Sequence, residues 1–458
     1  MHKKLTNAIY NDLLSKIQKK KANIAVLGAG YVGLPTAILF ANLGFIVTIL
    51  DIKSDVINNI NNGTNATCEP GLQELLRKTI KDGTLRAFLS SDFSFENQDI
   101  IIVSVQTPID KNSAPDFSFL LKATDQIGSM LKKGTLIIVC STVPPGTIQE
   151  KIKPRLSMIT FLKSEKQFFL AYVPERMAPG KALKEFAEGH RLVGGIGPKS
   201  TKLASSLFQN ICKNIIETNA KTAEIAKLAE NTFRDVNIAF ANQLALICEQ
   251  KNVDVKEVVS LANTHPRVNI HASGPGVGGP CLTKDPYLLV YNSKLKEKNL
   301  IQTARKINDR MPEHVLDLIL EAIKKTNRNI RETKVSILGI AYKGNVNDSR
   351  CSPSKKIIKS LLQLKAKVIS YDPFCKETFG AKKESSLSNT LKDSDCLVIV
   401  TAHSEFRELN LYKIKQLMNE KPIIIDGRRI INPIEDQKLG FLYFGIGYKN
   451  INSSKIIN

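Results

Sequence analysis

Short apolar runs separated by helix-periodic stretches dominate the first half of the chain. Residues 24–27 form one such run, which ends at Gly28 and is followed by helical periodicity to about residue 43 and a second run at 45–50. Apolar runs at 100–105 and 136–139 continue the alternation. Because continuous apolar strands that alternate with helices are buried on both faces, this pattern predicts a parallel sheet covered by helices.

The pattern changes in the middle of the chain and then returns. Residues 221–250 contain no glycine or proline, which predicts one helix about 45 Å long. Apolar runs then resume at 334–338, 368–371, 396–400 and 422–425. The predicted fold class is therefore α/β, with two Rossmann-like, doubly wound parallel-sheet domains joined by a long central helix.

The changes of pattern also predict the domain boundaries. We expect an N-terminal helical extension at 1–21, a first sheet domain at 22–218, a central helical domain at 219–318 and a second sheet domain at 319–458. The long helix of the central domain offers a surface for a homodimer.

Charge and composition limit the partners of the chain. The 458 residues carry a formal net charge of +22 with 43% hydrophobic and 24% charged residues, as in a globular protein that binds anions or has a lysine-rich surface. No tryptophan and no basic–aromatic interleaving is present, so we expect phosphorylated small molecules and no nucleic acid. No apolar run reaches the roughly 18 residues of a membrane span, and we expect no membrane partner.

The eight cysteines are scattered without a CxxC pair. This spacing argues against a metal site and a disulfide framework, and it favours a reducing, cytoplasmic location. No apolar segment follows the N-terminal lysines, so we expect no signal peptide.

The first strand leads into a dinucleotide-binding pattern, G-x-G-x-x-G, which then opens a helix. Its first glycine allows the tight turn, its second admits a pyrophosphate, and its third lets the helix lie close to the strand. Asp51 ends the second strand, where a carboxylate binds an adenosine ribose and repels a 2′-phosphate. The pattern therefore predicts NAD, held by Gly28, Gly30, Tyr31, Val32, Gly33 and Asp51.

Three loops at the ends of later strands carry polar side chains where open α/β sheets bind ligands. Thr107 and Thr142 supply hydroxyls beside prolines, as turn residues or as ligand contacts. Glu175 is suited to orient water or act as a base, and Arg176, followed by Met177, to hold an anion; an ordinary surface ion pair is the alternative.

The long helix carries a narrow polar stripe, Lys227, Asn231 and Arg234, at i, i+4 and i+7 between apolar flanks. A stripe this narrow favours a line of ligand-facing residues over a solvated face. A partly desolvated lysine in it is suited to proton transfer.

Cys281 lies in the loop 274–286, among four glycines and three prolines, with Lys284 and Asp285 close by. Such a loop brings backbone close to a ligand around an accessible thiol. With a nicotinamide cofactor, a thiol is needed when an aldehyde is oxidised again: it adds to the carbonyl, the adduct loses a second hydride, and water releases the acid from a thioester. This logic predicts a four-electron dehydrogenase that converts a primary alcohol to a carboxylate with two NAD.

From about residue 22 to 448 the chain resembles the UDP-glucose/GDP-mannose dehydrogenase family. The motifs that carry the resemblance are GAGYVG, STVPPGT, PERMAPG, KLAENTFRDVNIAFANQLALIC, GPGVGGPCLTKDP and AYKGNVNDSR. The resemblance implies that the domain at 22–218 binds NAD, that 219–318 dimerises, and that 319–458 binds a UDP-sugar.

The family pattern also implies roles for single residues. Cys281 would be the nucleophile and Lys227 the acid/base, with catalytic support from Asn231, Asp285, Thr142 and Glu175. Arg350, with Thr107 and Thr142, would contact the cofactor. The substrate would be held by Arg176, Met177, Lys227, Asn231, Arg234, His265, Arg267, Gly278, Tyr342, Lys343 and Arg428.

Within the family, the segments NTFRDVNIAFANQLALICE and HPRVN are similar to the branch that oxidises UDP-N-acetyl-D-mannosamine to its uronate. Oxidation of UDP-N-acetylglucosamine at C6 is the alternative sugar. A two-electron β-hydroxyacid-type dehydrogenase and a non-enzymatic NAD- or nucleic-acid-binding scaffold are the alternatives from other classes. Pro280 stands where many members have histidine, which removes histidine assistance from the position before the cysteine.

Overall fold

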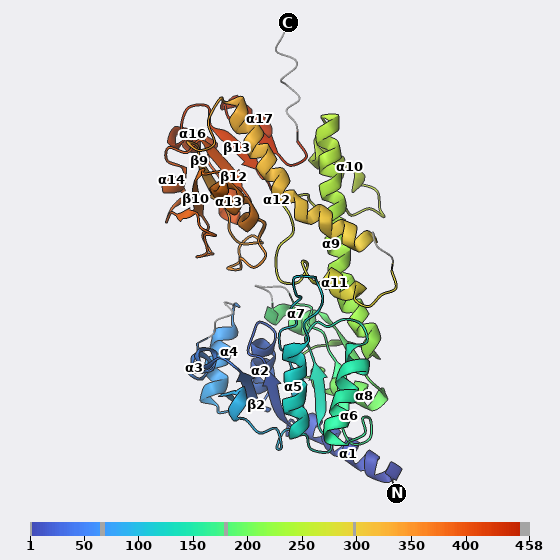
Figure 1. Cartoon of the computed structure of the whole chain (residues 1–458). Helices are drawn as coiled ribbons and strands as arrows, with labels where there is room; N and C mark the ends of the chain where they lie inside the picture. Colours follow the sequence, from blue (N-terminus) through green and yellow to red (C-terminus); the bar gives the residue numbers. More distant parts are fainter. Residues whose placement is uncertain (1, 65–68, 178–181, 296–298, 449–458) are drawn as a thin grey trace. The chain divides into compact units, whose positions relative to one another are not determined.

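A computed structural model describes residues 2–64, 69–177, 182–295 and 299–448 (Figure 1). The chain divides into two compact units. The first unit contains residues 1–230 and 287–293, and the second contains residues 231–286 and 294–458. Each unit is built on its own sheet.

The first unit holds an eight-stranded sheet with the strand order β3-β2-β1-β4-β5-β6-β7-β8. All neighbouring strands are parallel except β6 and β7. The strands are β1 (Asn23–Leu27), β2 (Ile46–Asp51), β3 (Leu85–Leu89), β4 (Ile100–Val103), β5 (Leu136–Val139), β6 (Phe169–Tyr172), β7 (His190–Gly195) and β8 (Asn214–Asn219).

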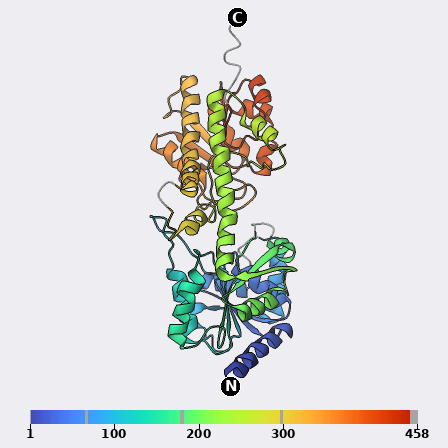
Figure 2. The same cartoon turned by 90° about the vertical axis from the view of Figure 1, so that its right-hand side faces the viewer.

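Helices cover both faces of this sheet, as the edge-on view in Figure 2 shows. They are α1 (His2–Gln18), α2 (Gly33–Asn42), α3 (Ser54–Asn61), α4 (Leu72–Lys81), α5 (Ser118–Ser129), α6 (Lys153–Thr160), α7 (Ala182–Glu188) and α8 (Pro198–Phe208), with a π-helical turn at Ile148–Ile152 and a 3-10 turn at Ser90–Asp92. The two apolar cores of the unit lie on opposite faces of the central strands.

The N-terminal helix α1 is part of this core. Leu13 and Ile17 are buried in the same apolar cluster as the strands, and the Tyr10 ring contacts Phe169 edge-on. Lys16 on the same helix forms an ion pair with Asp99 at the start of β4. The lysine-rich extension is therefore docked on the first sheet.

The second unit holds a six-stranded, all-parallel sheet with the order β11-β10-β9-β12-β13-β14. Its strands are β9 (Lys334–Leu338), β10 (Lys367–Tyr371), β11 (Lys382–Lys383), β12 (Cys396–Ile399), β13 (Ile423–Asp426) and β14 (Leu442–Gly445). Its helices are α10 (Val255–Ala262), α12 (Leu300–Lys325), α13 (Pro353–Gln363), α14 (Leu387–Leu391), α15 (Ser404–Arg407), α16 (Leu411–Leu417) and α17 (Pro433–Lys438).

The helices α9 (Ala220–Lys251) and α11 (Asp285–Val290) each contribute residues to both units. The helix predicted at 221–250 is thus confirmed to within a residue at each end, and the predicted α/β fold class is confirmed. The apolar run at 100–105 is longer than β4, which ends at Val103. No helix among the described residues is long and apolar enough to cross a membrane.

Candidate active site

The turn after β1 fits a dinucleotide. Gly28 has a φ of +95°, and a Cβ there would stand 2.4 Å from the carbonyl oxygen of Ser104. A Cβ on Gly33 would stand 1.9 Å from the carbonyl oxygen of Gly28, so both positions need glycine. A Cβ on Gly30 meets nothing within 4 Å, which leaves room beside the N-terminus of α2 for a pyrophosphate.

Asp51 holds this turn and keeps acceptor capacity for a ribose. One of its carboxylate oxygens accepts the N–H of Ala29 at 2.9 Å and the other accepts the N–H of Lys53 at 3.1 Å. Each oxygen has a second lone pair, so the residue fits the adenosine-side role predicted for it. The Tyr31 hydroxyl donates to Glu69 in the neighbouring segment.

The loops after β4 and β5 meet at the same end of the sheet. The Thr107 hydroxyl donates to the carbonyl of Thr142 at 2.6 Å, and the Ser141 hydroxyl donates to the carbonyl of Val105 at 2.6 Å. The structure therefore brings Thr107 and Thr142 together, beside the dinucleotide turn.

Glu224, which the sequence reasoning missed, ties the start of α9 to this region. Its fully buried carboxylate accepts the N–H of Gly146 at 2.5 Å and the N–H of Ile148 at 2.8 Å. Lys221, one turn earlier, pairs with Glu150 at 2.8 Å. Burial raises the pKa of Glu224 to about 7, against the opposing effect of the two backbone donors.

Glu175 is held by a second missed residue, Arg191 on β7. The two side chains form an ion pair at 3.1 Å and are 9% and 6% exposed, and the guanidinium lies over the rings of Phe186 and Phe208. Glu175 also accepts the N–H groups of Arg176 and Met177. Its carboxylate is thus fixed in one orientation.

Arg176 forms an ion pair with Glu230 on α9 at 2.7 Å and donates to the carbonyl of His190. Together these groups line a pocket of about 530 Å³ in the first unit. Residues 178–181, the end of the predicted PERMAPG loop, lie outside the described residues.

The α9 stripe divides at the boundary of the units. Lys227 belongs to the first unit and is 9% exposed, as expected for a partly desolvated amine. Asn231 belongs to the second unit, where its amide donates to the Asp285 carboxylate at 2.6 Å. This hydrogen bond fixes the end of the Cys281 loop, and it joins two residues that the sequence singled out separately.

The beginning of the same loop is fixed by a buried polar network that the sequence reasoning missed. The N–H of Gly274 donates to Asn242 on α9 at 2.8 Å, and Asn242 donates to Asn308 on α12 at 2.9 Å. Asn308 donates in turn to Asp235 at 2.8 Å, which also pairs with Arg305 at 2.6 Å. The side chains of all four residues are buried, so each depends on its partners for hydrogen bonding.

Cys281 is exposed between these two anchors. The loop 342–351 supports its backbone: the N–H of Gly279 donates to the carbonyl of Arg350 at 3.0 Å. A Cβ on Gly278 would stand 2.7 Å from the Tyr342 side chain and from the Cys351 carbonyl, so Gly278 is required for this close approach. Burial, with Asp348 nearby, raises the pKa of the half-buried Tyr342.

The other predicted ligand groups of the second unit lie around this loop or near α9. Arg350 pairs with Asp348 at 2.6 Å, and Lys343 is exposed. Arg428 lies against Gly274 and donates to the Val400 carbonyl. Burial, and the charge of Arg234 after it, lower the pKa of His271. The Asn237 amide donates to the carbonyl of Asn269, in the segment that follows the exposed His265 and Arg267.

No group of three or more His, Cys, Asp or Glu side chains among the described residues is placed to hold a metal ion.

Comparisons with known proteins identify the class. Models of the UDP-glucose/GDP-mannose dehydrogenase family match the NAD-binding domain at residues 22–212, the central domain at 221–310 and the UDP-binding domain at 336–433. The chain belongs to this family of NAD-dependent nucleotide-sugar dehydrogenases.

Individual relatives match nearly the whole chain. A UDP-N-acetyl-D-mannosamine dehydrogenase of Pyrococcus horikoshii is 42% identical over 93% of this chain and 99% of its own. A solved structure of that enzyme superposes with a TM-score of 0.86, and a UDP-N-acetyl-mannosamine dehydrogenase structure from Staphylococcus aureus, 36% identical and covering 93% of this chain and 98% of its own, gives 0.82. An NDP-N-acetyl-D-galactosaminuronic acid dehydrogenase of Ralstonia nicotianae is 36% identical over 88% of this chain and 95% of its own.

The Glu224 pKa predicts how stability depends on pH. Because burial raises its folded pKa to about 7 from 4.5, the folded state binds more protons between these values, and stability falls as pH rises through that window. A Glu224→Gln variant cannot titrate there. Relative to it, we expect the wild type to lose about 2–3 kcal/mol between pH 5 and pH 8, measured by denaturant unfolding. If the wild type instead became more stable relative to Glu224→Gln as the pH rises to 8, the effect of the two backbone donors on the Glu224 pKa would outweigh that of burial.

The Asn242 anchor predicts a link between α9 and the thiol loop. Asn242→Leu leaves the Gly274 N–H and the Asn308 carbonyl oxygen without partners, at about 1–3 kcal/mol each. We expect a variant that folds but has at least a tenfold lower kcat and a changed rate of Cys281 alkylation by iodoacetamide. Gln250→Leu, at an exposed position of the same helix, is the control. Wild-type kcat and alkylation rate in Asn242→Leu would contradict the anchor.

Proposed function

We propose that this protein oxidises the C6 hydroxymethyl group of a UDP-N-acetylhexosamine to a carboxylate with two NAD, and that the sugar is N-acetyl-D-mannosamine. The assignment of the sugar rests on the 42% identity to a UDP-N-acetyl-D-mannosamine dehydrogenase over nearly the whole of both chains. The balanced reaction takes one alcohol, one water and two NAD⁺ to one carboxylate, two NADH and three protons.

The dinucleotide turn and Asp51 support the cofactor assignment. The first unit presents Gly28, Gly30 and Gly33 as the cradle for the pyrophosphate and Asp51 for the ribose. Bound there, NAD supplies the hydride acceptor. Thr107 and Thr142 would position its nicotinamide end, and Arg350 of the second unit would contact it after release from Asp348.

Lys227 would take the proton of the C6 hydroxyl in the first oxidation. Its side chain is 9% exposed, so little bulk water reaches the amine. The thiolate of Cys281 then adds to the aldehyde, and the tetrahedral adduct loses a second hydride to become a thioester.

Hydrolysis completes the cycle. The Asn231 amide would stabilise the oxyanion of the tetrahedral adducts, and the Asp285 carboxylate, to which that amide donates at 2.6 Å, would orient water. Glu175, locked by Arg191, is the second carboxylate available to orient water in the same step.

The remaining basic groups fit a sugar nucleotide. Tyr342, Lys343 and Arg428 lie at the carboxyl ends of the second sheet, where an anionic ligand binds in this architecture. Arg176, Met177, Arg234, His265, Arg267 and the backbone at Gly278 complete the proposed set of substrate contacts.

The second sheet cannot offer the same dinucleotide site as the first. Asp372 occupies the position equivalent to Asp51 at the end of β10, but it accepts the N–H groups of Ile340, Ala341, Phe374 and Cys375 and a bond from His403. Its acceptor capacity is consumed inside the protein. This difference supports one NAD site per chain.

We also propose a homodimer formed through α9. A groove of about 360 Å³, lined mainly by apolar side chains, runs between α9 and α12 in the second unit, and Phe233, Phe240 and Leu300 are 66%, 54% and 70% exposed along it. A second copy of the same groove would cover these side chains, since a two-fold interface pairs like with like.

Stoichiometry tests the chemistry. With UDP-N-acetyl-D-mannosamine, we expect two NADH per sugar consumed and the uronate as product. Cys281→Ala should lose acid formation by at least a thousandfold while still binding NAD, because the aldehyde has no thiol to hold it. Met158→Ala, at an exposed position, serves as the control.

Three outcomes would change the proposal. One NADH per sugar would favour a two-electron dehydrogenase with a structural cysteine. Faster turnover of UDP-N-acetylglucosamine or UDP-N-acetylgalactosamine would replace the sugar and keep the mechanism. An absence of UDP-sugar binding in calorimetry would favour a non-enzymatic scaffold.

Oligomeric state tests the α9 surface. We expect sedimentation velocity to give twice the 50.7 kDa mass of one chain for the wild type and a shift toward the single-chain mass for Phe240→Asp. Ile434→Asp, also at an exposed apolar position, should leave the dimer intact. A monomeric wild type, or an unchanged dimer in Phe240→Asp, would exclude this interface.

A further inference from the structure

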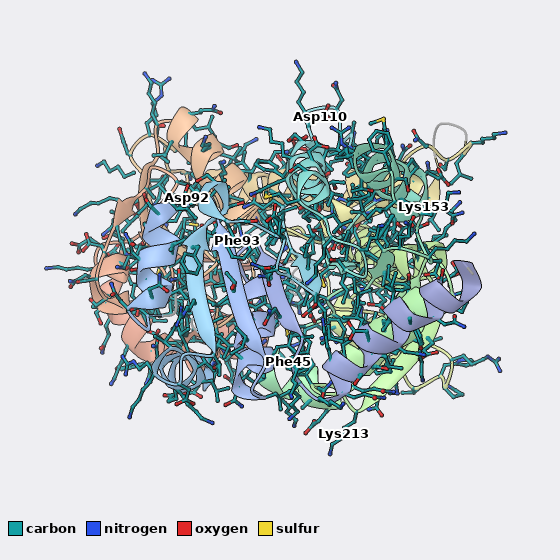
Figure 3. The ribbon with its side chains drawn as sticks, turned by 90° about the horizontal axis from the view of Figure 1, so that it is seen from below. Phe45, Asp92, Phe93, Asp110, Lys153 and Lys213 are labelled. Carbon is teal, nitrogen blue, oxygen red and sulfur yellow. The ribbon has the colours of Figure 1, made fainter. Side chains whose placement is uncertain are left out.

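The net charge of +22 is not explained by binding one NAD and one UDP-sugar, and part of it gathers at one edge of the first sheet. We call this the amino edge: the edge at which β1, β4, β5 and β6 begin, with the end of α1 and the start of α8. The register Ile24↔Ile100, Ile100↔Leu136 and Leu136↔Phe169 places these strand beginnings side by side. Figure 3 shows the molecule from below, with α1 as the helix at the lower right and Phe45, the residue before β2, labelled.

Direct contacts join the segments of the amino edge. The N–H of Gly134 donates to the Gln167 carbonyl, and Asp99 accepts bonds from Lys16, Lys132 and the N–H of Asn23. Lys199, at the start of α8, donates from its backbone to Glu165 and from its side chain to Asn7. The loops before four strands, the end of α1 and the start of α8 therefore form one surface.

This surface is strongly basic. Its segments (7–23, 94–99, 131–136, 160–168 and 197–200) contain nine lysines and four carboxylates: Lys16, Lys19, Lys20, Lys21, Lys132, Lys133, Lys163, Lys166 and Lys199 against Asp12, Glu96, Asp99 and Glu165. Asp99 and Glu165 are turned inward onto backbone donors, whereas Lys19, Lys20, Lys21, Lys133, Lys163 and Lys166 are exposed. At about 4.8 Å between strands, β1 and β6 begin about 14 Å apart, so the lysine fields overlap within roughly two Debye lengths.

Exposed apolar side chains accompany the lysines. Phe161, which follows α6 and precedes Lys163, is 90% exposed, and Met158 in the last turn of α6 is 67% exposed. Phe161 has a φ of +56°, a left-handed conformation that is uncommon for a bulky residue. An exposed aromatic side chain beside several lysines favours binding to a membrane interface. Burial of the apolar side chain and attraction between the lysines and anionic lipids both contribute to the binding free energy.

We propose that the amino edge of the first unit binds the anionic lipid headgroups of a membrane surface, with Phe161 and Met158 entering the headgroup region. The exposed side chains of Phe161 and Met158 favour lipid over nucleic acid, because an apolar side chain gains free energy by entering the headgroup region, whereas phosphate groups along a nucleic acid offer it no apolar environment. Peripheral attachment of this kind needs no membrane-spanning helix. This proposal differs from the sequence-based expectation of no membrane partner, which rested on the absence of a membrane-spanning segment.

Attachment at this edge leaves the cofactor site of the first unit accessible. The dinucleotide turn and the loops at Thr107 and Thr142 lie at the opposite ends of the same strands. The proposal therefore predicts that lipid binding and dehydrogenase activity are independent of each other. It does not rest on the identity of the sugar.

Co-sedimentation of the full chain with vesicles tests the surface. With phosphatidylcholine vesicles containing phosphatidylglycerol, we expect binding at low salt that falls steeply as salt is raised, and none to vesicles of phosphatidylcholine alone. Lys19→Glu/Lys20→Glu/Lys21→Glu should weaken binding about a hundredfold. Lys359→Glu/Lys365→Glu/Lys413→Glu makes the same change of net charge at exposed lysines of the second unit and should bind like wild type.

A second variant separates lipid from other polyanions. Phe161→Ser keeps every charge and should weaken vesicle binding about tenfold, because an exposed ring no longer enters the interface. Dehydrogenase activity should be unchanged in all these variants. Absence of binding to anionic vesicles, equal loss in the second-unit control, or duplex DNA or RNA competing fully while Phe161→Ser binds normally would each overturn the proposal.

Discussion

The loop that carries Cys281 depends on a set of hydrogen bonds between buried side chains of α9 and α12. A loop of four glycines and three prolines cannot hold a thiol in place through its own secondary structure. Asn242 and Asn231 supply what the loop lacks, one at its start through Gly274 and one at its end through Asp285. Because Asp235, Arg305 and Asn308 complete the bonding of Asn242, the position of Cys281 is set by the core of the second unit.

The sequence was sufficient for the fold class and for the family of the chain. Continuous apolar strands, the glycine pattern and the uninterrupted helix each have a local cause, and the structure bears them out. The α9 stripe and the cysteine loop were also visible, as separate features. The bond between Asn231 and Asp285 was not, since nothing local indicates which residues 54 positions apart will meet.

The residues that sequence reasoning missed act through tertiary contact. Glu224 and Arg191 look like ordinary charged residues of a helix and a strand, and only burial against Gly146 or Glu175 shows their use. The six strands not predicted include β7, which runs against its neighbour, and β11, which has two residues. The family resemblance implied roles for the candidate catalytic residues but none for Glu224 and Arg191.

The reversal between β6 and β7 has a directional consequence. In a sheet of parallel strands joined by right-handed crossovers, each helix runs from the ligand-binding end back toward the other end. Since β8 is parallel to β7, it runs opposite to β1–β6, and the helix that follows it travels toward the ligand-binding end. One antiparallel pairing thus turns α9 from a covering helix into one that brings the Glu224 carboxylate to the loop after β5.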